Sequence, residues 1–193
     1  MKSKQNLLVQ ERGIVIMKNV YAQCPVYETE SFIFRLVKVE DAEDLLACYS
    51  DEETVSKLNS DYCTSDFFYK TKEEMEKCIK FWLEEYEKRY YVRFAVILKL
   101  RQHAVGTIEI FGGEAGVLRI DLAKKYNTKD NITEIAKLAI KTFAEDFEIR
   151  SIKIKTGNTP ERIKWLENLG FVSSKKYRPQ LGYHEYDVAK SGL

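Results

Sequence analysis

The chain lacks the features that mark several classes of protein. None of its apolar runs approaches the roughly 20 residues that a bilayer-spanning helix needs. The short apolar run at residues 7–9 is followed at once by Gln-Glu-Arg at 10–12, which is not typical of a secretory signal peptide. We therefore expect a cytoplasmic protein that does not act at a membrane.

An excess of charge of one sign is also absent. The 31 basic and 30 acidic residues leave a formal net charge of +1, which disfavours nucleic-acid binding driven by bulk charge. With 193 residues, 45% of them hydrophobic, the chain is most simply one globular domain with a sizeable core. Residues 1–30 have weak periodicity and are interpreted as an N-terminal extension, and residues 31–193 as the domain.

Metal and thiol chemistry find little support. The sequence has two histidines and no CxxC pair, so the spacing of a zinc site is missing. The four cysteines are widely separated: Cys24, Cys48, Cys63 and Cys78. Cys48 and Cys78 fall in predicted helices, where a small buried thiol is the usual role. No base or cation adjacent in sequence would lower the pKa of Cys63, so we expect neither a metal site nor a catalytic thiol.

Hydrophobic periodicity predicts strands and helices in a mixed order. The pattern at 71–90 is the strongest helix signal, because apolar residues recur at spacings of three and four behind a capping box of Thr71 and Glu74. Strict alternation at 105–111 and 117–122 predicts half-buried strands. In order, we expect a strand at 31–39, helices at 41–49, 51–58 and 71–90, strands at 92–100, 105–111 and 117–122, a helix at 131–147, a strand at 151–156, a helix at 159–169, and strands at 171–177 and 182–189.

A short polar loop joins the strand at 117–122 to the following helix. The N-terminus of a helix offers unpaired backbone N–H groups and a partial positive charge, so it suits a phosphate or pyrophosphate. Asn131 and Glu134 match an Asn-x-x-Glu cap for this helix. The loop has no glycine and carries Asp130, which opposes the close approach of an anion. Either the loop binds an anion, or Asp130 simply caps a helix at a loop that binds nothing.

The order of elements, taken with three segments, resembles the GNAT family of acetyl-CoA-dependent N-acetyltransferases. Residues 32–36 and 41–45 are similar to the opening strand and first helix of the branch that acetylates the N-termini of ribosomal proteins. Residues 105–108 resemble its central hairpin, and residues 165–171 (Trp-Leu-Glu-Asn-Leu-Gly-Phe) its closing helix-to-strand segment, the most specific match. The resemblance covers residues 30–190. It implies an α/β (α+β) fold with a mixed, mostly antiparallel central sheet flanked by helices.

The resemblance also implies a site for acetyl-CoA as co-substrate. The family usually has glycines in its pyrophosphate loop, and the segment at 127–130 has none, so the loop is degenerate. Lys124, Lys125 and Lys129 can compensate with charge. Asn158 is one residue out of register with a cofactor-binding Asn of the family and can equally be a turn residue. The predicted cofactor contacts are Ile120, Leu122, Asn127, Thr128, Lys129, Asp130, Asn131, Ile132 and Asn158.

The implied chemistry is direct acetyl transfer from a thioester to a primary amine, which requires a general base and a proton donor for the leaving thiolate. Glu109 and Asp121 are the predicted bases, because both lie on central strands. Asp121 shares a strand face with Arg119 and can instead be its ion-pair partner, and Glu109 can be merely solvated. Tyr177 is the predicted proton donor. Backbone N–H groups at 120–122 are expected to stabilise the tetrahedral intermediate. The predicted acceptor contacts are Asn59, Asp61 and Cys63.

Two classes of function stay open from the sequence. The first is an N-acetyltransferase whose acceptor is the amine of a protein N-terminus or of a small metabolite, with no nucleic-acid or membrane partner. The second is a catalytically inactive GNAT-fold binding or regulatory module, which the glycine-free loop with Asp130 favours. A third interpretation is an enzyme that uses a different acyl-CoA. The terminal strands and the 12 Tyr, 10 Phe and 2 Trp residues leave room for a homodimer interface.

Overall fold

A computed structural model describes residues 19–58, 67–156 and 159–190 of the chain. The described residues contain one eight-stranded sheet with the strand order β1-β2-β3-β4-β5-β6-β8-β7. Neighbouring strands are antiparallel except β5 and β6, which are parallel. The strands are β1 (Tyr27–Glu28), β2 (Phe32–Leu36), β3 (Val92–Leu98), β4 (His103–Phe111), β5 (Val117–Leu122), β6 (Ser151–Lys155), β7 (Val172–Ser173) and β8 (Tyr183–Asp187).

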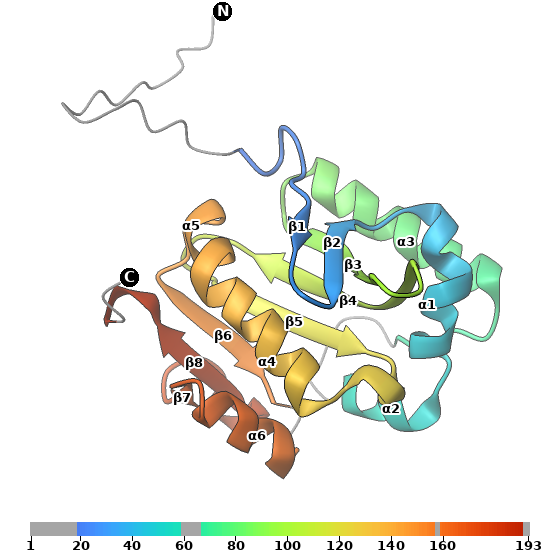
Figure 1. Ribbon diagram of the computed structural model, residues 1–193. Helices are drawn as coiled ribbons and strands as arrows, with labels where there is room; N and C mark the ends of the chain where they lie inside the picture. Colours follow the sequence, from blue (N-terminus) through green and yellow to red (C-terminus); the bar gives the residue numbers. More distant parts are fainter. Residues whose placement is uncertain (1–18, 59–66, 157–158, 191–193) are drawn as a thin grey trace, which may run out of the picture.

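Helices cover both faces of this sheet (Figure 1). They are α1 (Ala42–Tyr49), α2 (Glu52–Leu58), α3 (Lys72–Glu87), α4 (Lys129–Leu138), α5 (Ala144–Asp146) and α6 (Pro160–Glu167). A π-helical turn, Ala139–Phe143, joins α4 to α5. α1 and α3 pack on one face of the sheet, whereas α4 and α6 pack against each other on the other face. The prediction of a mixed, mostly antiparallel sheet flanked by helices is confirmed.

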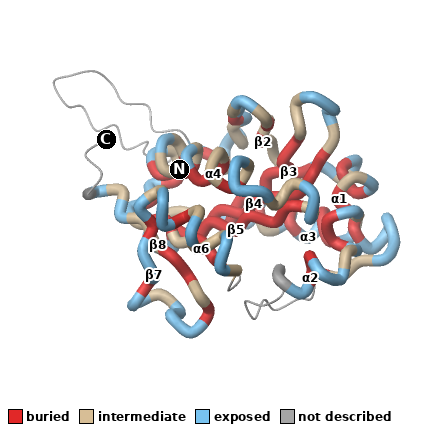
Figure 2. The backbone as a smooth tube through the Cα atoms, turned by 60° about the horizontal axis from the view of Figure 1, so that its bottom comes forward, coloured by how far each residue is buried: buried red, intermediate tan, exposed pale blue. Residues whose placement is uncertain are grey.

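Successive side chains of the central strands point alternately to the two faces of the sheet and pack in different apolar clusters. Ile108 and Ile120 are buried in one apolar cluster with Ile132 of α4. Ala95 belongs to a second cluster, with Trp82 of α3. Figure 2 shows β3, β4 and β5 buried along most of their length, with exposed surface on the outer helices. The alternation read from the sequence thus places the polar residues of β4 and β5 on the face that α1 and α3 cover.

The capping box predicted for α3 is confirmed. The Thr71 hydroxyl accepts a hydrogen bond from the Glu74 N–H at 3.2 Å, and the Glu74 carboxylate accepts one from the Thr71 N–H at 3.2 Å. The strand predicted at 171–177 is much shorter than expected, since β7 ends at Ser173. The Ser174 hydroxyl accepts the N–H of Tyr177 at 3.0 Å, and this local hydrogen bond turns the chain away from the sheet.

β1 lies within residues 1–30, the segment interpreted as an extension. Tyr27 is 6% exposed, and its hydroxyl donates to Asp146 Oδ2 at 2.8 Å, so this part of the segment packs on the sheet. The domain boundary at residue 31 stays a prediction. Among the described residues, no helix combines the length and the apolar character that crossing a membrane requires.

Candidate active site

The parallel strands β5 and β6 diverge after two paired positions. Val117 pairs with Lys153 and Leu118 with Ile154, and the pairing ends there. Past this point Arg162 of α6 reaches β5, where its Nη2 donates to the Ile120 carbonyl at 3.0 Å. Burial lowers the pKa of Arg162 to about 10, and its enclosed Nε has no hydrogen-bond partner among the described residues. Beyond the paired positions, β5 is therefore contacted by the Arg162 side chain of α6 and no longer by the backbone of β6.

The start of α4 lies beside this gap, and its cap differs from the predicted one. Thr128 is the N-cap, and its hydroxyl accepts the N–H of Asn131 at 3.4 Å. The cap predicted at Asn131 is wrong because the Asn131 side chain donates back to the Tyr126 carbonyl at 2.8 Å. Glu134 is also engaged elsewhere, since it accepts the N–H of Ser31 at 2.7 Å. The helix therefore begins two residues earlier than expected, at Lys129.

The N-terminus of α4 can accept an anion at its backbone. Within the described residues, the N–H groups of Lys129 and Asp130 have no acceptor, and both residues are exposed. Asp130 does not cap the helix; it lies in the first turn, where its carboxylate opposes an incoming phosphate. Of the compensating lysines, Lys124 is ion-paired with Glu53, whereas Lys125 is exposed next to the loop. These residues fit a pyrophosphate at the backbone, with Asp130 as the opposing charge.

The remaining predicted cofactor contacts differ in what they can offer. Ile120 and Leu122 point into the core beneath α4, so only their backbone groups face the gap. Ile132 is fully buried and is likewise limited to its backbone. The side-chain oxygen of Asn127 is buried and has no hydrogen-bond partner in the part of the chain that the structure describes. Asn158 lies outside the described residues.

Asp121 is enclosed by donors on the opposite face of the sheet. It is 1% exposed, and Arg119 Nε donates to its two oxygens at 2.9 and 2.8 Å. Arg93 Nη1 and the Tyr49 hydroxyl each donate to Oδ2 at 3.2 Å. Asp121 is thus the ion-pair partner of Arg119, as the second interpretation expected. With its oxygens so occupied, we infer that it positions the two arginines.

Glu109 is held differently. Its Oε2 accepts a charged hydrogen bond from Arg93 Nη2, whereas its Oε1 takes no hydrogen bond from the described residues. Glu109 is 9% exposed and lines two adjoining cavities. Of the two predicted bases, Glu109 is therefore the one with an oxygen available to a bound amine. Its role as a base stays a prediction.

Arg93, which the sequence analysis did not single out, holds this cluster together. It is 1% exposed on β3, and its guanidinium lies 4.3 Å from the centroid of the Trp82 ring. Its Nη1 also donates to the Thr107 hydroxyl at 3.0 Å. Burial acts to lower the pKa of Arg93, but the charges of Glu109 and Asp121 outweigh it and raise the pKa above its ordinary value. An arginine inside an otherwise apolar strand was the signal in the sequence.

Two cavities meet at Glu109. The larger, of about 820 Å³, lies between α3 and the sheet, and the smaller, of about 240 Å³, extends toward β6 and β8. They share four lining residues: Glu109, Phe111, Arg119 and Arg178. Tyr177 lines the smaller cavity, with its ring edge-on to Tyr183 at 5.0 Å between centroids. The structure thus brings two of the three predicted catalytic side chains, Glu109 and Tyr177, to one cavity.

The predictions for the cysteines and for the acceptor contacts are compared with the structure one by one. Cys48 and Cys78 are buried as predicted, and burial raises the pKa of Cys78 to about 11, so it is a poor nucleophile. The predicted acceptor contacts, Asn59, Asp61 and Cys63, lie outside the described residues.

Residues 31–172 match the sequence model of a protein family described as an acetyltransferase (GNAT) domain. The chain belongs to the GNAT acetyltransferase family. The predicted family, and with it the prediction of an N-acetyltransferase enzyme, is confirmed. A comparison with curated protein sequences found no match.

Solved GNAT structures share the fold of this chain at low sequence identity. An acetyltransferase of the family from Bacillus anthracis is 18% identical with a TM-score of 0.63, over 86% of this chain and 100% of that one. A ribosomal-protein alanine acetyltransferase from Vibrio fischeri is 17% identical with a TM-score of 0.55, over 86% and 98% of the two chains. RimL, a ribosomal-protein alpha-N-acetyltransferase in complex with coenzyme A, is 9% identical with a TM-score of 0.59, over 84% and 98%.

Proposed function

We propose that this GNAT protein transfers the acetyl group of acetyl-CoA to a primary amine. The observation that carries the proposal is the position of Glu109, which lines a cavity on one side of the sheet and whose Oε1 takes no hydrogen bond from the described residues. Arg119, which lines the same cavity, is the residue directly before Ile120, where β5 has separated from β6. The accessible start of α4 follows β5 in the chain. In this proposal the amine would bind at Glu109 and the pyrophosphate at the start of α4, with the unpaired part of β5 between them.

In this proposal the cofactor is held mainly by backbone groups. The N–H groups at the start of α4, including those of Lys129 and Asp130, would bind the pyrophosphate. The edge of β5 at Ile120 and Leu122, which β6 no longer pairs, would hold the arm that leads to the thioester once the bond from Arg162 to the Ile120 carbonyl is released. When bound, acetyl-CoA supplies an acetyl group activated for attack by an amine. RimL in complex with coenzyme A supports this choice of cofactor by analogy of fold alone.

Side chains that line the two cavities would accept and donate the protons of the reaction. A primary amine arrives as an ammonium ion, and Glu109 would accept its proton through Oε1 while Arg93 keeps Oε2 in place. Tyr177, at the other end of the smaller cavity, would donate a proton to the leaving thiolate. Asp121 would act indirectly, because it holds Arg93 and Arg119 in position.

Calorimetric titration of acetyl-CoA into the purified protein, with coenzyme A as the comparison, tests this proposal first. A micromolar dissociation constant, about −8 kcal/mol, is the expected result. Acetyl transfer to an amine, followed through release of the free thiol, is the second requirement. Tighter binding of a longer acyl-CoA would instead assign the protein to a different acyl donor.

A non-catalytic binding or regulatory module is the second candidate. It is favoured by Asp130 at the start of α4 and by Arg162 across the gap, since both oppose entry of the cofactor. Absence of acetyl-CoA binding at millimolar concentration would favour this module over the enzyme.

Replacement of Arg162 by Ala is expected to strengthen acetyl-CoA binding. A ligand that uses the edge of β5 has to break the bond from Arg162 to the Ile120 carbonyl, and the alanine variant has no such bond to break. We expect a dissociation constant about threefold to tenfold lower by calorimetry, equal to roughly 0.7–1.4 kcal/mol. Lys164→Ala on the exposed side of α6 is the matched control. Weaker binding in Arg162→Ala would show that the guanidinium contacts the ligand.

Replacement of Asp130 by Asn is expected to strengthen acetyl-CoA binding as well. The change removes a negative charge from the first turn of α4 without altering the size of the side chain. We expect a dissociation constant about threefold to tenfold lower at low salt, with the gain shrinking as ionic strength rises. Glu145→Gln, at the far end of the same helical segment, is the control. Equal dissociation constants for the Asp130→Asn variant and the parent protein would show that the start of α4 is not part of the acetyl-CoA site.

A further inference from the structure

Aromatic rings from four parts of the chain form much of the wall of the larger cavity. Phe67 and Tyr69 precede α3, and Phe81 and Trp82 belong to α3. Tyr91 directly precedes β3, and Phe111 is the last residue of β4. Tyr91 and Phe111 pack against each other with centroids 5.0 Å apart. The cavity of about 820 Å³ is within the range of roughly 300–1,000 Å³ typical of small-molecule sites.

The charged groups on the floor of this cavity are already engaged, with one exception. The Arg93 guanidinium lies over the Trp82 ring at 4.3 Å and is ion-paired with Glu109 and Asp121. The Arg119 guanidinium lies over the Phe67 ring at 4.6 Å and is paired with Asp121. The exception is Glu109 Oε1, which takes no hydrogen bond from the described residues. The floor therefore offers one negatively charged position to a ligand.

Four further charged residues line the cavity, two of them acidic and two basic. Of its two acids, Glu85 is ion-paired with Lys88 at 2.8 Å. Glu74 caps α3 by accepting two backbone N–H groups. Lys77 and Arg178 also line the cavity, and no ion pair is recorded for either of them within the described residues. These two basic side chains disfavour a ligand with a second positive charge, such as a polyamine.

We infer that the acceptor is a small primary monoamine with an aromatic body. The inference rests on the proposed function. Its ammonium group would bind Glu109 Oε1, and its ring would pack among Phe81, Trp82 and Tyr91, where aromatic rings prefer offset or edge-to-face contacts. A peptide N-terminus fits this cavity less well, because each buried peptide unit brings an N–H and a carbonyl that need partners, and among the rings of the wall only Tyr69, Trp82 and Tyr91 carry a hydrogen-bonding group.

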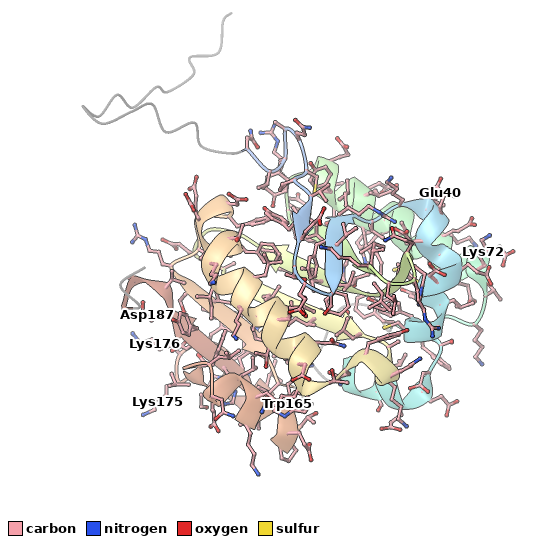
Figure 3. The ribbon with its side chains drawn as sticks, in the orientation of Figure 1. Glu40, Lys72, Trp165, Lys175, Lys176 and Asp187 are labelled. Atoms are coloured by element: carbon pink, nitrogen blue, oxygen red, sulfur yellow. The ribbon has the colours of Figure 1, made fainter. Side chains whose placement is uncertain are left out.

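Trp82 provides a direct test that does not depend on acetyl-CoA. The chain has two tryptophans, and Trp165 lies on α6, at the other end of the sheet from α3 (Figures 1 and 3). In a Trp165→Phe background, Trp82 fluorescence reports occupancy of the cavity. We expect phenethylamine to bind about tenfold tighter or more than hexylamine, spermidine or a short peptide with a free serine N-terminus.

One variant in the wall and one in the floor of the cavity test the contact to the aromatic ring and the contact to the ammonium group separately. Phe81 is 50% exposed, so Phe81→Ala is expected to fold normally and to weaken phenethylamine binding about fivefold or more, with a smaller effect on hexylamine. Glu109→Gln is expected to weaken both amines to a similar extent. Leu100→Ala, at an 88% exposed position in the turn between β3 and β4, is the control.

The outcomes distinguish this inference from the proposed function. Acetyl transfer to spermidine or to the peptide in preference to phenethylamine would overturn the inference and leave the proposed function standing. Quenching of Trp82 by phenethylamine without any binding of acetyl-CoA would support the aromatic amine site and overturn the proposed function. No response of Trp82 to millimolar phenethylamine would overturn the inference.

Discussion

Glu109→Gln is expected to lower kcat/KM for amine acetylation by about 10²–10⁴-fold, while the dissociation constant for acetyl-CoA stays unchanged. The substitution keeps the shape of the side chain and removes the carboxylate that would accept the proton of the amine. The loss should fall on turnover and on the KM for the amine, and acetyl-CoA affinity should be spared, because Glu109 lines the cavity and does not lie at the start of α4. Steady-state kinetics with a primary amine, paired with calorimetry of acetyl-CoA, measure the two effects separately.

Glu84→Gln is the matched control for this experiment. Glu84 is exposed on α3 and does not line the larger cavity, so its kinetics are expected to equal those of the parent protein. An activity of Glu109→Gln within threefold of the parent value would exclude Glu109 as the base. Asp121 would not be the replacement candidate, because its oxygens are occupied by Arg93, Arg119 and Tyr49.

Arg93→Met is expected to lower the free energy of unfolding by about 3–5 kcal/mol, the cost of removing one partner from a buried ion pair. Methionine matches much of the length of arginine but leaves the buried carboxylates of Glu109 and Asp121 without their shared cation. It also removes the guanidinium that packs on the Trp82 ring. Urea unfolding followed by circular dichroism at neutral pH measures the change.

The control for this prediction is Arg101→Met, in the exposed turn between β3 and β4, where a change within about 0.5 kcal/mol is expected. The double variant Arg93→Met with Asp121→Asn is expected to regain part of the lost stability, because one of the two orphaned charges is then absent. A loss below about 1 kcal/mol in Arg93→Met would mean that Arg119 alone compensates both carboxylates.

The ion-pair cluster explains how one carboxylate is prepared for a ligand while its neighbour is not. Arg93 binds both, but Arg119 and Tyr49 add further donors only to Asp121. One oxygen of Glu109 is therefore left facing the cavity, on a side chain whose orientation is fixed by a charged hydrogen bond. Groups fixed before the ligand arrives need no reorganisation during the reaction.

The cap of α4 shows where local signals in a sequence reach their limit. Thr128 and Asn131 are both good N-cap residues, so propensity alone does not choose between them. The choice depends on the Tyr126 carbonyl, which binds the Asn131 amide, and on Ser31, a residue distant in sequence that binds Glu134. The register of this helix also decides which N–H groups are available to an anion.

The sequence by itself determined the fold class, the order of most elements and the sheet face on which each residue of β4 and β5 lies. These properties follow from periodicity and from contacts between near neighbours in the chain. Only the tertiary structure decided that Arg93 joins Glu109 to Asp121, that Arg162 binds the Ile120 carbonyl, and that aromatic rings from four segments line one cavity. These contacts join residues far apart in the chain, and their formation depends on how the strands and helices pack.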